Sequence, residues 1–233
     1  DARPGDHLGD AVLDRLLRFG LHGRLLLAGA ARAILGRAVE TARAMGRTTA
    51  AHCHGTGGIK NSVLAGIDSI EHGTYLDEET AAMMVEHGTA LVTTLAVANP
   101  DMTNISPSQQ VEARRLEETF AKVRTRMRET IEIARRLGVF MGNGSDAGGN
   151  ALAPHEFSMA RELHDLVENG CSPLEALTIV TGNNARVLRW DHEIGKLECS
   201  KLADIVVLGG DPLEDIDNVR KVEMVFKSGE RVQ

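Results

Sequence analysis

The chain has 233 residues, 42% apolar and 25% charged, which is enough for one large domain or for one domain with an appendage. A formal net charge of −7 and the lack of any basic run argue against nucleic acid as the main partner. No apolar run approaches the roughly 20 residues of a membrane span, and the first residues do not resemble a signal peptide. We therefore expect a soluble protein with a small-molecule partner and no membrane partner.

The cysteines indicate a reduced compartment. Cys53, Cys171 and Cys199 are odd in number and far apart, so they form no disulfide framework, and we expect a cytoplasmic protein. Cys53 stands between two histidines and could bind a metal. Side chains alternate along a strand, however, so the sequence favours a buried Cys53 that points away from both histidines.

The beginning of the chain gives the weakest pattern. Within residues 1–33, residues 10–19 could form a short helix and 25–27 a strand, but glycines interrupt both. Residues 34–45 have apolar side chains at helical spacing, and Gly46 suits the position after a helix. Because the first residue is not methionine, we expect that this sequence was cut from a longer one.

The next part of the chain alternates between strands and helices. Its pattern predicts strands at 49–54, 67–72 and 89–95, and helices at 57–64 and 78–87, the second with Asp77 as N-cap. A polar segment, 96–107, then leads to a long charged helix at 108–137 and a strand at 139–143. Such alternation is typical of parallel βαβ units, and a loop as long as 96–107 is often a lid.

The predicted elements change from helices to strands near residue 190. Helices are expected at 154–169 and from the capping box Ser172–Glu175 to about Val180. Beyond Trp190, a strand at 203–208 and a hairpin around Ser228–Gly229 predict a small β appendage. We therefore divide the chain into a lead segment, a barrel-like part and an appendage, at 1–33, 34–190 and 191–233.

Three polar side chains follow predicted strands. His52 and His72 each stand at a strand end, close to a glycine, and Asp146 lies in the sequence Gly-Ser-Asp-Ala-Gly after the strand 139–143. Ligands of parallel α/β folds collect at the carboxyl ends of the strands. Imidazole and carboxylate are ligands of a catalytic zinc, so these three residues predict a metal site. Glu71 precedes His72, and alternation places its side chain on the helix side.

The same stretches resemble the amidohydrolase superfamily, with the imidazolonepropionase-like and Xaa-Pro dipeptidase-like enzymes as the nearest branch. The resemblance covers roughly residues 34–233. It is carried by Thr49–Thr74, Gly144–Gly148, Pro154–Phe157, Ser172–Leu177 and Gly195–Leu208. It implies a (β/α)8 TIM barrel of the metal-dependent hydrolase type, incomplete here with strands from about 4 or 5 to 8. The appendage would be part of a small β-sandwich.

The resemblance also implies roles for single residues. His52 and His72 match the metal ligands on the fifth and sixth barrel strands. Asp146 matches the aspartate on the eighth strand, which binds metal and takes a proton from the attacking water. His54 matches a position that often contacts substrate. The candidate substrate-binding residues are therefore His54, Tyr75 in the loop 73–78, and His155. His155 could equally be a surface histidine at a helix start.

The sequence departs from the family pattern in its first part. No His-x-His pair of the first barrel strand is present, since His7 and His22 stand alone. The first lysine is Lys60, which follows the predicted fifth strand rather than lying on the fourth. We therefore expect the C-terminal half of such an enzyme, which could form a homo-oligomer, with little or no activity as this chain alone.

Three functions remain open on the sequence. The first is a hydrolase that uses one or two divalent ions, with zinc expected, to cleave the C–N bond of a dipeptide, an N-acyl amino acid or a similar small amide. The second is a catalytically impaired module that only binds or assembles. The third is a deaminase or lactonase on the same scaffold.

Overall fold

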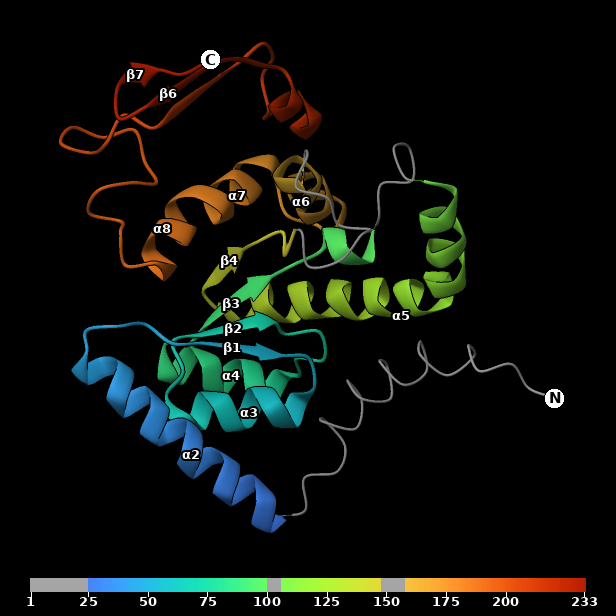
Figure 1. The fold of residues 1–233 in the computed structure, drawn as a ribbon, viewed down its shortest axis with the longest axis vertical. Helices are drawn as coiled ribbons and strands as arrows, with labels where there is room; N and C mark the ends of the chain where they lie inside the picture. Colours follow the sequence, from blue (N-terminus) through green and yellow to red (C-terminus); the bar gives the residue numbers. More distant parts are fainter. Residues whose placement is uncertain (1–24, 100–105, 148–157) are drawn as a thin grey trace. The chain divides into compact units, whose positions relative to one another are not determined.

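The computed structural model describes residues 25–99, 106–147 and 158–233 (Figure 1). His155, most of the lead segment and the first residues of the predicted helix 154–169 lie outside these ranges. The chain forms two units: unit 1 comprises Asp1–Val92 and Val111–Phe140, and unit 2 comprises Thr93–Gln110 and Met141–Gln233. No described helix is both long and apolar enough to cross a membrane.

Unit 1 is built from βα units. Its elements are α2 (Leu25–Ala44), β1 (Ala50–Cys53), α3 (Thr56–Ala65), β2 (Ser69–His72), α4 (Glu78–His87), most of β3 (Ala90–Thr93) and most of α5 (Pro107–Leu137). β1 pairs with β2 and β2 with β3, both in parallel. With β4 (Met141–Asn143) the strand order is β1-β2-β3-β4, as expected for consecutive βαβ units.

Capping residues mark the ends of the helices α3 and α4 in unit 1. Asp77 accepts a hydrogen bond from Thr80 N at 2.8 Å, so the predicted N-cap of α4 is confirmed. Gly66 and Gly88 end α3 and α4 in the left-handed conformation. α3 and α4 lie along one face of β1 and β2 (Figure 1). Their buried side chains form a core with those of the strands and α5: Ile59, Val63, Ile70, Ala81, Met84, Leu91, Met127 and Ile131.

The start of the described chain is helical. The sequence offered Leu25–Leu27 as a possible strand, but these residues open the 20-residue helix α2. A short apolar run has no periodicity that separates a strand from a buried helix turn. The alanine-rich sequence that follows favours the helix, which therefore begins well before the predicted residue Ile34.

Unit 2 contains β4 and the helices that follow it. These are α6 (Ser158–Glu168), α7 (Pro173–Thr178), the π-helical turn η2 (Ile179–Asn183) and α8 (Asn184–Val187); η1 (Ala96–Ala98), also in unit 2, precedes β4. The capping box at the start of α7 is confirmed, because the side chains of Ser172 and Glu175 each bond to the other's backbone. Gly144 N donates to Thr93 O at 2.9 Å, which joins the chain after β4 to the end of β3.

The end of unit 2 is a small antiparallel sheet. It contains β5 (Ile205–Leu208), β6 (Val222–Lys227) and β7 (Glu230–Arg231), with η3 (Ile216–Arg220) before β6. Ser228 and Gly229 both have positive φ, 52° and 85°, as a two-residue hairpin turn of type I′ requires. β5 pairs with the hairpin as predicted. His164 Nδ1 on α6 lies 3.1 Å from Asp217 Oδ2 of η3. This contact connects the segment before β6 to the helices of unit 2.

Candidate metal centre

Three histidines of unit 1 meet where β1 and β2 end. They are His52 in β1, His54 just after it, and His72 at the end of β2; we call them the His cluster. One nitrogen of each lies within 4.8 Å of the other two. His72 Nε2 is 2.8 Å from His52 Nδ1, and the rings of His54 and His72 stack with centroids 4.7 Å apart. The predicted meeting of His52 and His72 at one strand edge is therefore observed.

The backbone of His72 explains how this meeting is achieved. In the strand register, Cys53 is the partner of His72, and His52 is the partner of Glu71. Paired residues of a sheet present their side chains to the same face, so a regular strand would turn His72 away from His52. His72 instead has φ of 73°, a left-handed conformation that is uncommon outside glycine. This turn at the strand end directs the imidazole toward His52.

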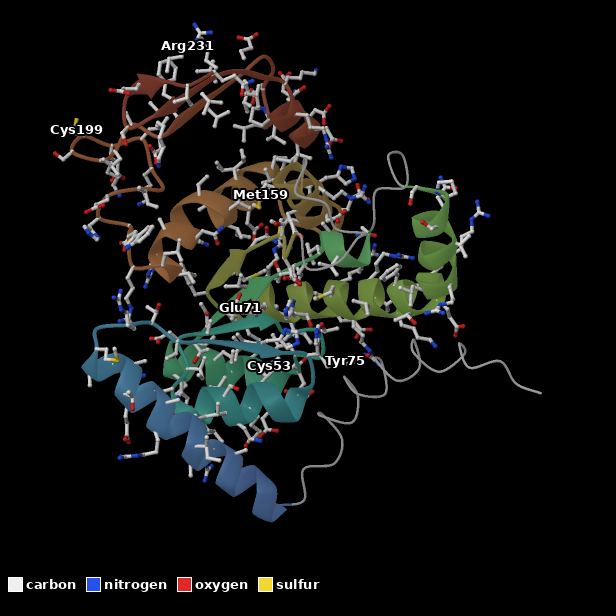
Figure 2. All side chains as sticks on the ribbon, viewed as in Figure 1. Cys53, Glu71, Tyr75, Met159, Cys199 and Arg231 are labelled. Carbon is white, nitrogen blue, oxygen red and sulfur yellow. The ribbon has the colours of Figure 1, made fainter. Side chains whose placement is uncertain are left out.

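The same register corrects the expectation for Glu71. Its side chain lies on the His52 face rather than the helix side, where it accepts a hydrogen bond from Ser69 Oγ at 2.6 Å. Cys53 points to the helix side as predicted, with its Sγ 3.4 Å from Ser62 Oγ of α3, but it is half-buried rather than buried (Figure 2). Burial raises the pKa of both Glu71 and Cys53. The sequence argument failed for Glu71 because it assumed that alternation continued through His72.

Two threonines hold the segment that follows β2. Thr74 is buried, and its Oγ1 lies 2.8 Å from His54 Nδ1. Thr130 of α5 donates its hydroxyl to the carbonyl oxygens of Gly73 and Thr74, both at 3.1 Å. A hydrogen-bond partner on one ring nitrogen orients an imidazole and leaves the other nitrogen for a ligand. No sequence pattern identified Thr74, although its place two residues after His72 is a usable signal.

The His cluster suits a divalent metal ion. Burial, followed by the charge of His52, lowers the pKa of His72 to about 4, so this imidazole is neutral at pH 7. Neutral imidazole nitrogens are the form that binds metal, and they suit zinc and several other first-row ions. His72 is buried and His54 half-buried, whereas His52 is exposed, so the cluster is open on the side of His52.

Tyr75, predicted to contact substrate, stands beside this cluster. Its backbone N donates to His54 O at 2.9 Å, and Thr56 Oγ1 donates to Tyr75 O at 2.6 Å. The guanidinium of Arg126 lies 5.7 Å from the centre of its half-buried ring. The loop after β2 is thus held to the loop after β1 through the backbone.

Asp146 belongs to unit 2 and is exposed. It follows β4 by three residues and has φ of 48°, a second left-handed position at a strand end. Ala147 N donates to Ser145 Oγ at 3.3 Å within the same turn. Its expected roles as ligand and base stay predictions, as do the substrate contacts of His54 and Tyr75. His155 lies outside the described residues.

Comparison with known proteins settles the family. The sequence pattern of the amidohydrolase family matches residues 29–232. The chain belongs to the amidohydrolase family. The resemblance stated from the sequence is confirmed, and so is the fold class: an α/β fold of the TIM-barrel type, present here as part of a barrel with a small antiparallel sheet.

Three relatives illustrate the range of this similarity. The chain is 29% identical to ochratoxinase of Aspergillus niger over 200 residues, which are 82% of this chain and 39% of that protein. It is 30% identical to the imidazolonepropionase of Erwinia tasmaniensis over 178 residues, 73% of this chain and 37% of that one. A solved Xaa-Pro dipeptidase with methionine in its active site is 31% identical, with a TM-score of 0.72 over 85% of this chain and 48% of that one. The chain thus spans half or less of the length of these relatives.

Proposed function

We propose that the protein is a metal-dependent hydrolase of a C–N bond in a small amide, such as a dipeptide or an N-acyl amino acid. The observation that carries the proposal is the His cluster at adjoining strand ends in a chain of the amidohydrolase family. Relatives named as a dipeptidase and an ochratoxinase support the choice of an amide-like bond. We expect zinc, as one or two ions.

We assign His52 and His72 as metal ligands, with His54 either joining them or contacting substrate. When bound, a divalent ion supplies Lewis-acid polarisation of a carbonyl and lowers the pKa of water. The assignment of Asp146 as a further ligand and as general base rests on its place in the family motif. As base it would take a proton from the attacking water and return it to the leaving nitrogen. The carbonyl carbon then gains the hydroxyl and the C–N bond breaks.

Tyr75 and His155 are assigned to substrate binding. The backbone of Tyr75 is bonded to that of His54, which supports a place for its ring near the bound amide. The assignment of His155 rests on the sequence alone.

The test measures metal content and amide hydrolysis together. The chain, His52→Ala, His72→Ala, Asp146→Asn and the control His87→Ala are purified, loaded with zinc and assayed for bound zinc and for turnover of dipeptides and N-acyl amino acids. His87 is an exposed histidine at the end of α4 and should change neither quantity. We expect zinc loss in both cluster variants and turnover loss in all three site variants. Equal zinc content in His72→Ala and the unmodified chain would overturn the metal assignment. Zinc binding without turnover of any amide would overturn C–N hydrolysis by this chain and favour the catalytically impaired module.

A further inference from the structure

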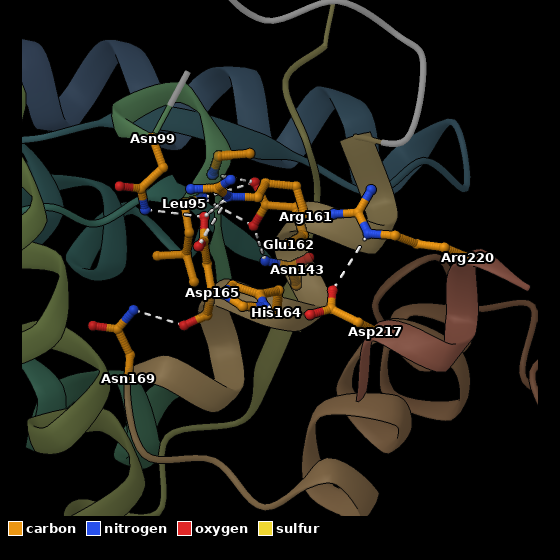
Figure 3. Close-up of polar contacts among 11 residues, drawn as sticks. Leu95, Asn99, Asn143, Arg161, Glu162, His164, Asp165, Asn169, Asp217 and Arg220 are labelled. Carbon is orange, nitrogen blue, oxygen red and sulfur yellow. Dashed lines mark hydrogen bonds and ion pairs between the residues drawn. The ribbon is translucent and has the colours of Figure 1, made fainter. Parts of the chain in front are cut away.

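Unit 2 contains a fully buried carboxylate that the proposed reaction does not use. Glu162 of α6 has 0% relative exposure. Its Oε1 accepts hydrogen bonds from Leu95 N at 2.8 Å and Ala96 N at 2.7 Å, and its Oε2 accepts one from Asn143 Nδ2 at 2.7 Å (Figure 3). Among the described residues its partners are N–H groups rather than a cation.

These bonds join the carboxyl ends of two strands. Leu95 and Ala96 lie two and three residues after the end of β3, as the N-cap and the first residue of η1, whereas Asn143 is the last residue of β4. Asn143 Nδ2 also lies 3.1 Å from both Thr93 O and Thr93 Oγ1, at the end of β3. One side chain from α6 therefore fixes the start of the loop after β3 and the end of β4.

The backbone of Asn143 is held from another side as well. Asn143 N donates to Asn184 Oδ1 at 2.9 Å, and Asn184 Nδ2 donates to Asn143 O at 2.7 Å. We call Glu162, Asn143, Thr93, Leu95, Ala96 and Asn184 the Glu162 network. Its hydrogen bonds leave little freedom to the residue from which the turn to Asp146 departs.

Packing alone does not account for Glu162. A buried carboxylate without a cation loses its hydration, and a leucine or methionine would fill a helix–sheet contact without that loss. The carboxylate instead provides directional hydrogen bonds, because its two oxygens have several lone pairs and can accept from three donors on two segments at once. Those segments are the bases of the two loops at this edge of unit 2.

We propose that Glu162 is a positioning residue for the hydrolysis proposed above: it orders residues 94–99, which follow β3, and, through Asn143, the turn that presents Asp146. The inference rests on that proposed function for its effect on rate. The ordering itself does not depend on it.

The test uses Glu162→Gln, with Glu168→Gln as the matched control. Glu168 is an exposed glutamate on the same helix. A glutamine at 162 keeps the shape but replaces one acceptor oxygen by a donor amide, so it faces at least one of the three N–H groups donor to donor. Glu162→Asp, which keeps the charge on a shorter side chain, serves as the second variant if Glu162→Gln fails to fold.

Two quantities are measured: backbone amide hydrogen exchange at Leu95, Ala96 and Gly144, and the division of any rate loss between kcat and KM. In Glu162→Gln we expect exchange at these amides to rise about tenfold relative to the rest of unit 2. We expect kcat to fall about tenfold or more with KM and zinc content nearly unchanged. Glu168→Gln should match the unmodified chain.

The outcomes separate the two proposals. Unchanged exchange at all three amides in both variants at position 162 would overturn the positioning role, whatever the activity. Faster exchange with unchanged kcat in an active protein would also overturn it, because the ordered segments would not matter to the reaction. Exchange is measured without substrate, so it decides the ordering even if the proposed hydrolysis fails its own test.

Discussion

The His cluster of unit 1 and the Glu162 network of unit 2 both stand at strand ends but are built in opposite ways. The His cluster brings ring nitrogens of three histidines within 4.8 Å of one another, and one of these histidines is exposed. The Glu162 network is closed, since its carboxylate has 0% exposure and accepts from three N–H groups. An open set of nitrogen donors can take a ligand from outside, whereas a closed set can only hold its own chain in place.

The two sets also differ in what fixes them. His72 reaches His52 through its own backbone, which is left-handed with φ of 73° at the end of β2. Glu162 reaches Leu95 across 67 positions of the sequence through side-chain hydrogen bonds. The first arrangement therefore depends on local conformation and the second on tertiary packing.

Removal of bound metal should affect the His cluster and leave the Glu162 network unchanged, which is the largest difference expected between the two regions. Removing the metal with a strong chelator should abolish amide hydrolysis, with a loss of about 100-fold or more, and added zinc should restore it. Exchange at Leu95 and Ala96 should stay the same, because no residue of the Glu162 network belongs to the His cluster. Activity that survives complete removal of metal, measured on the same sample, would contradict the metal-dependent reaction.

The pH dependence of stability should distinguish the buried carboxylate. Burial raises the pKa of Glu162 from 4.5 to about 7; the bonds from Asn143, Ala96 and Leu95 oppose this rise, and the charge of Asp165 adds to it. Because the pKa is raised in the folded state, the contribution of Glu162 to the free energy of unfolding is fully present at low pH. That contribution is lost as the pH rises through about 7. Relative to Glu162→Gln, the free energy of unfolding should fall by up to about 3 kcal/mol between pH 5 and 8.

Chemical denaturation of both proteins across this pH range measures the difference. The control is Glu168→Gln, which should follow the unmodified chain. A difference that does not change with pH would mean that the three N–H donors outweigh burial and keep Glu162 ionised throughout.

Glycine at position 73 should matter through its neighbour Leu91. Gly73 has φ of 60°, and a Cβ there would overlap Leu91 Cδ1. We expect Gly73→Ala to lower the free energy of unfolding by about 2 kcal/mol, from left-handed strain and overlap together. Gly88 shares the left-handed backbone, with φ of 69°, but has open space at its Cβ position.

Gly88→Ala should therefore cost less than Gly73→Ala and leave zinc affinity intact. In Gly73→Ala we expect zinc affinity to fall as well, because the substitution adjoins His72. Equal losses of stability in the two variants would show that Leu91 yields without strain.

Loss of the Thr74 hydroxyl should have the smallest effect. Thr74→Val keeps the side-chain shape but removes the partner of His54 Nδ1, so zinc affinity should fall about tenfold. Thr74→Ser retains the hydroxyl and should stay near the unmodified value. Competition with a chelating dye measures both; a valine variant that binds zinc as tightly as the serine variant would mean that the hydroxyl does not orient His54.

The sequence predicted the parts that depend on local chemistry. Asp77 as an N-cap, the Ser172–Glu175 capping box and the Ser228–Gly229 turn all follow from side-chain or backbone rules within four residues, and all three are confirmed. The meeting of His52 and His72 was also predicted, because parallel strands bring their carboxyl ends to one edge.

The parts that were missed depend on what a linear pattern does not contain. Glu71 was placed on the wrong face because strict alternation does not foresee a left-handed residue at the strand end. Leu25–Leu27 could be a strand on the sequence but is helical, because a short apolar run suits either element. Glu162 looked like one more glutamate on a helix, since its partners lie 19, 66 and 67 positions away.

The left-handed pair His72 and Gly73 also restricts how this site can diversify. Any side chain at position 73 meets both an unfavourable backbone angle and Leu91 Cδ1, so single substitutions there carry two penalties at once. A smaller residue at 91 removes only one of them. Accessible mutational paths therefore pass first through position 91, a residue of β3 that belongs to the core and not to the His cluster. In a library that varies both positions, replacements of Gly73 should be recovered together with a smaller side chain at position 91. The size of a buried core residue would then limit which residues can stand beside the His cluster.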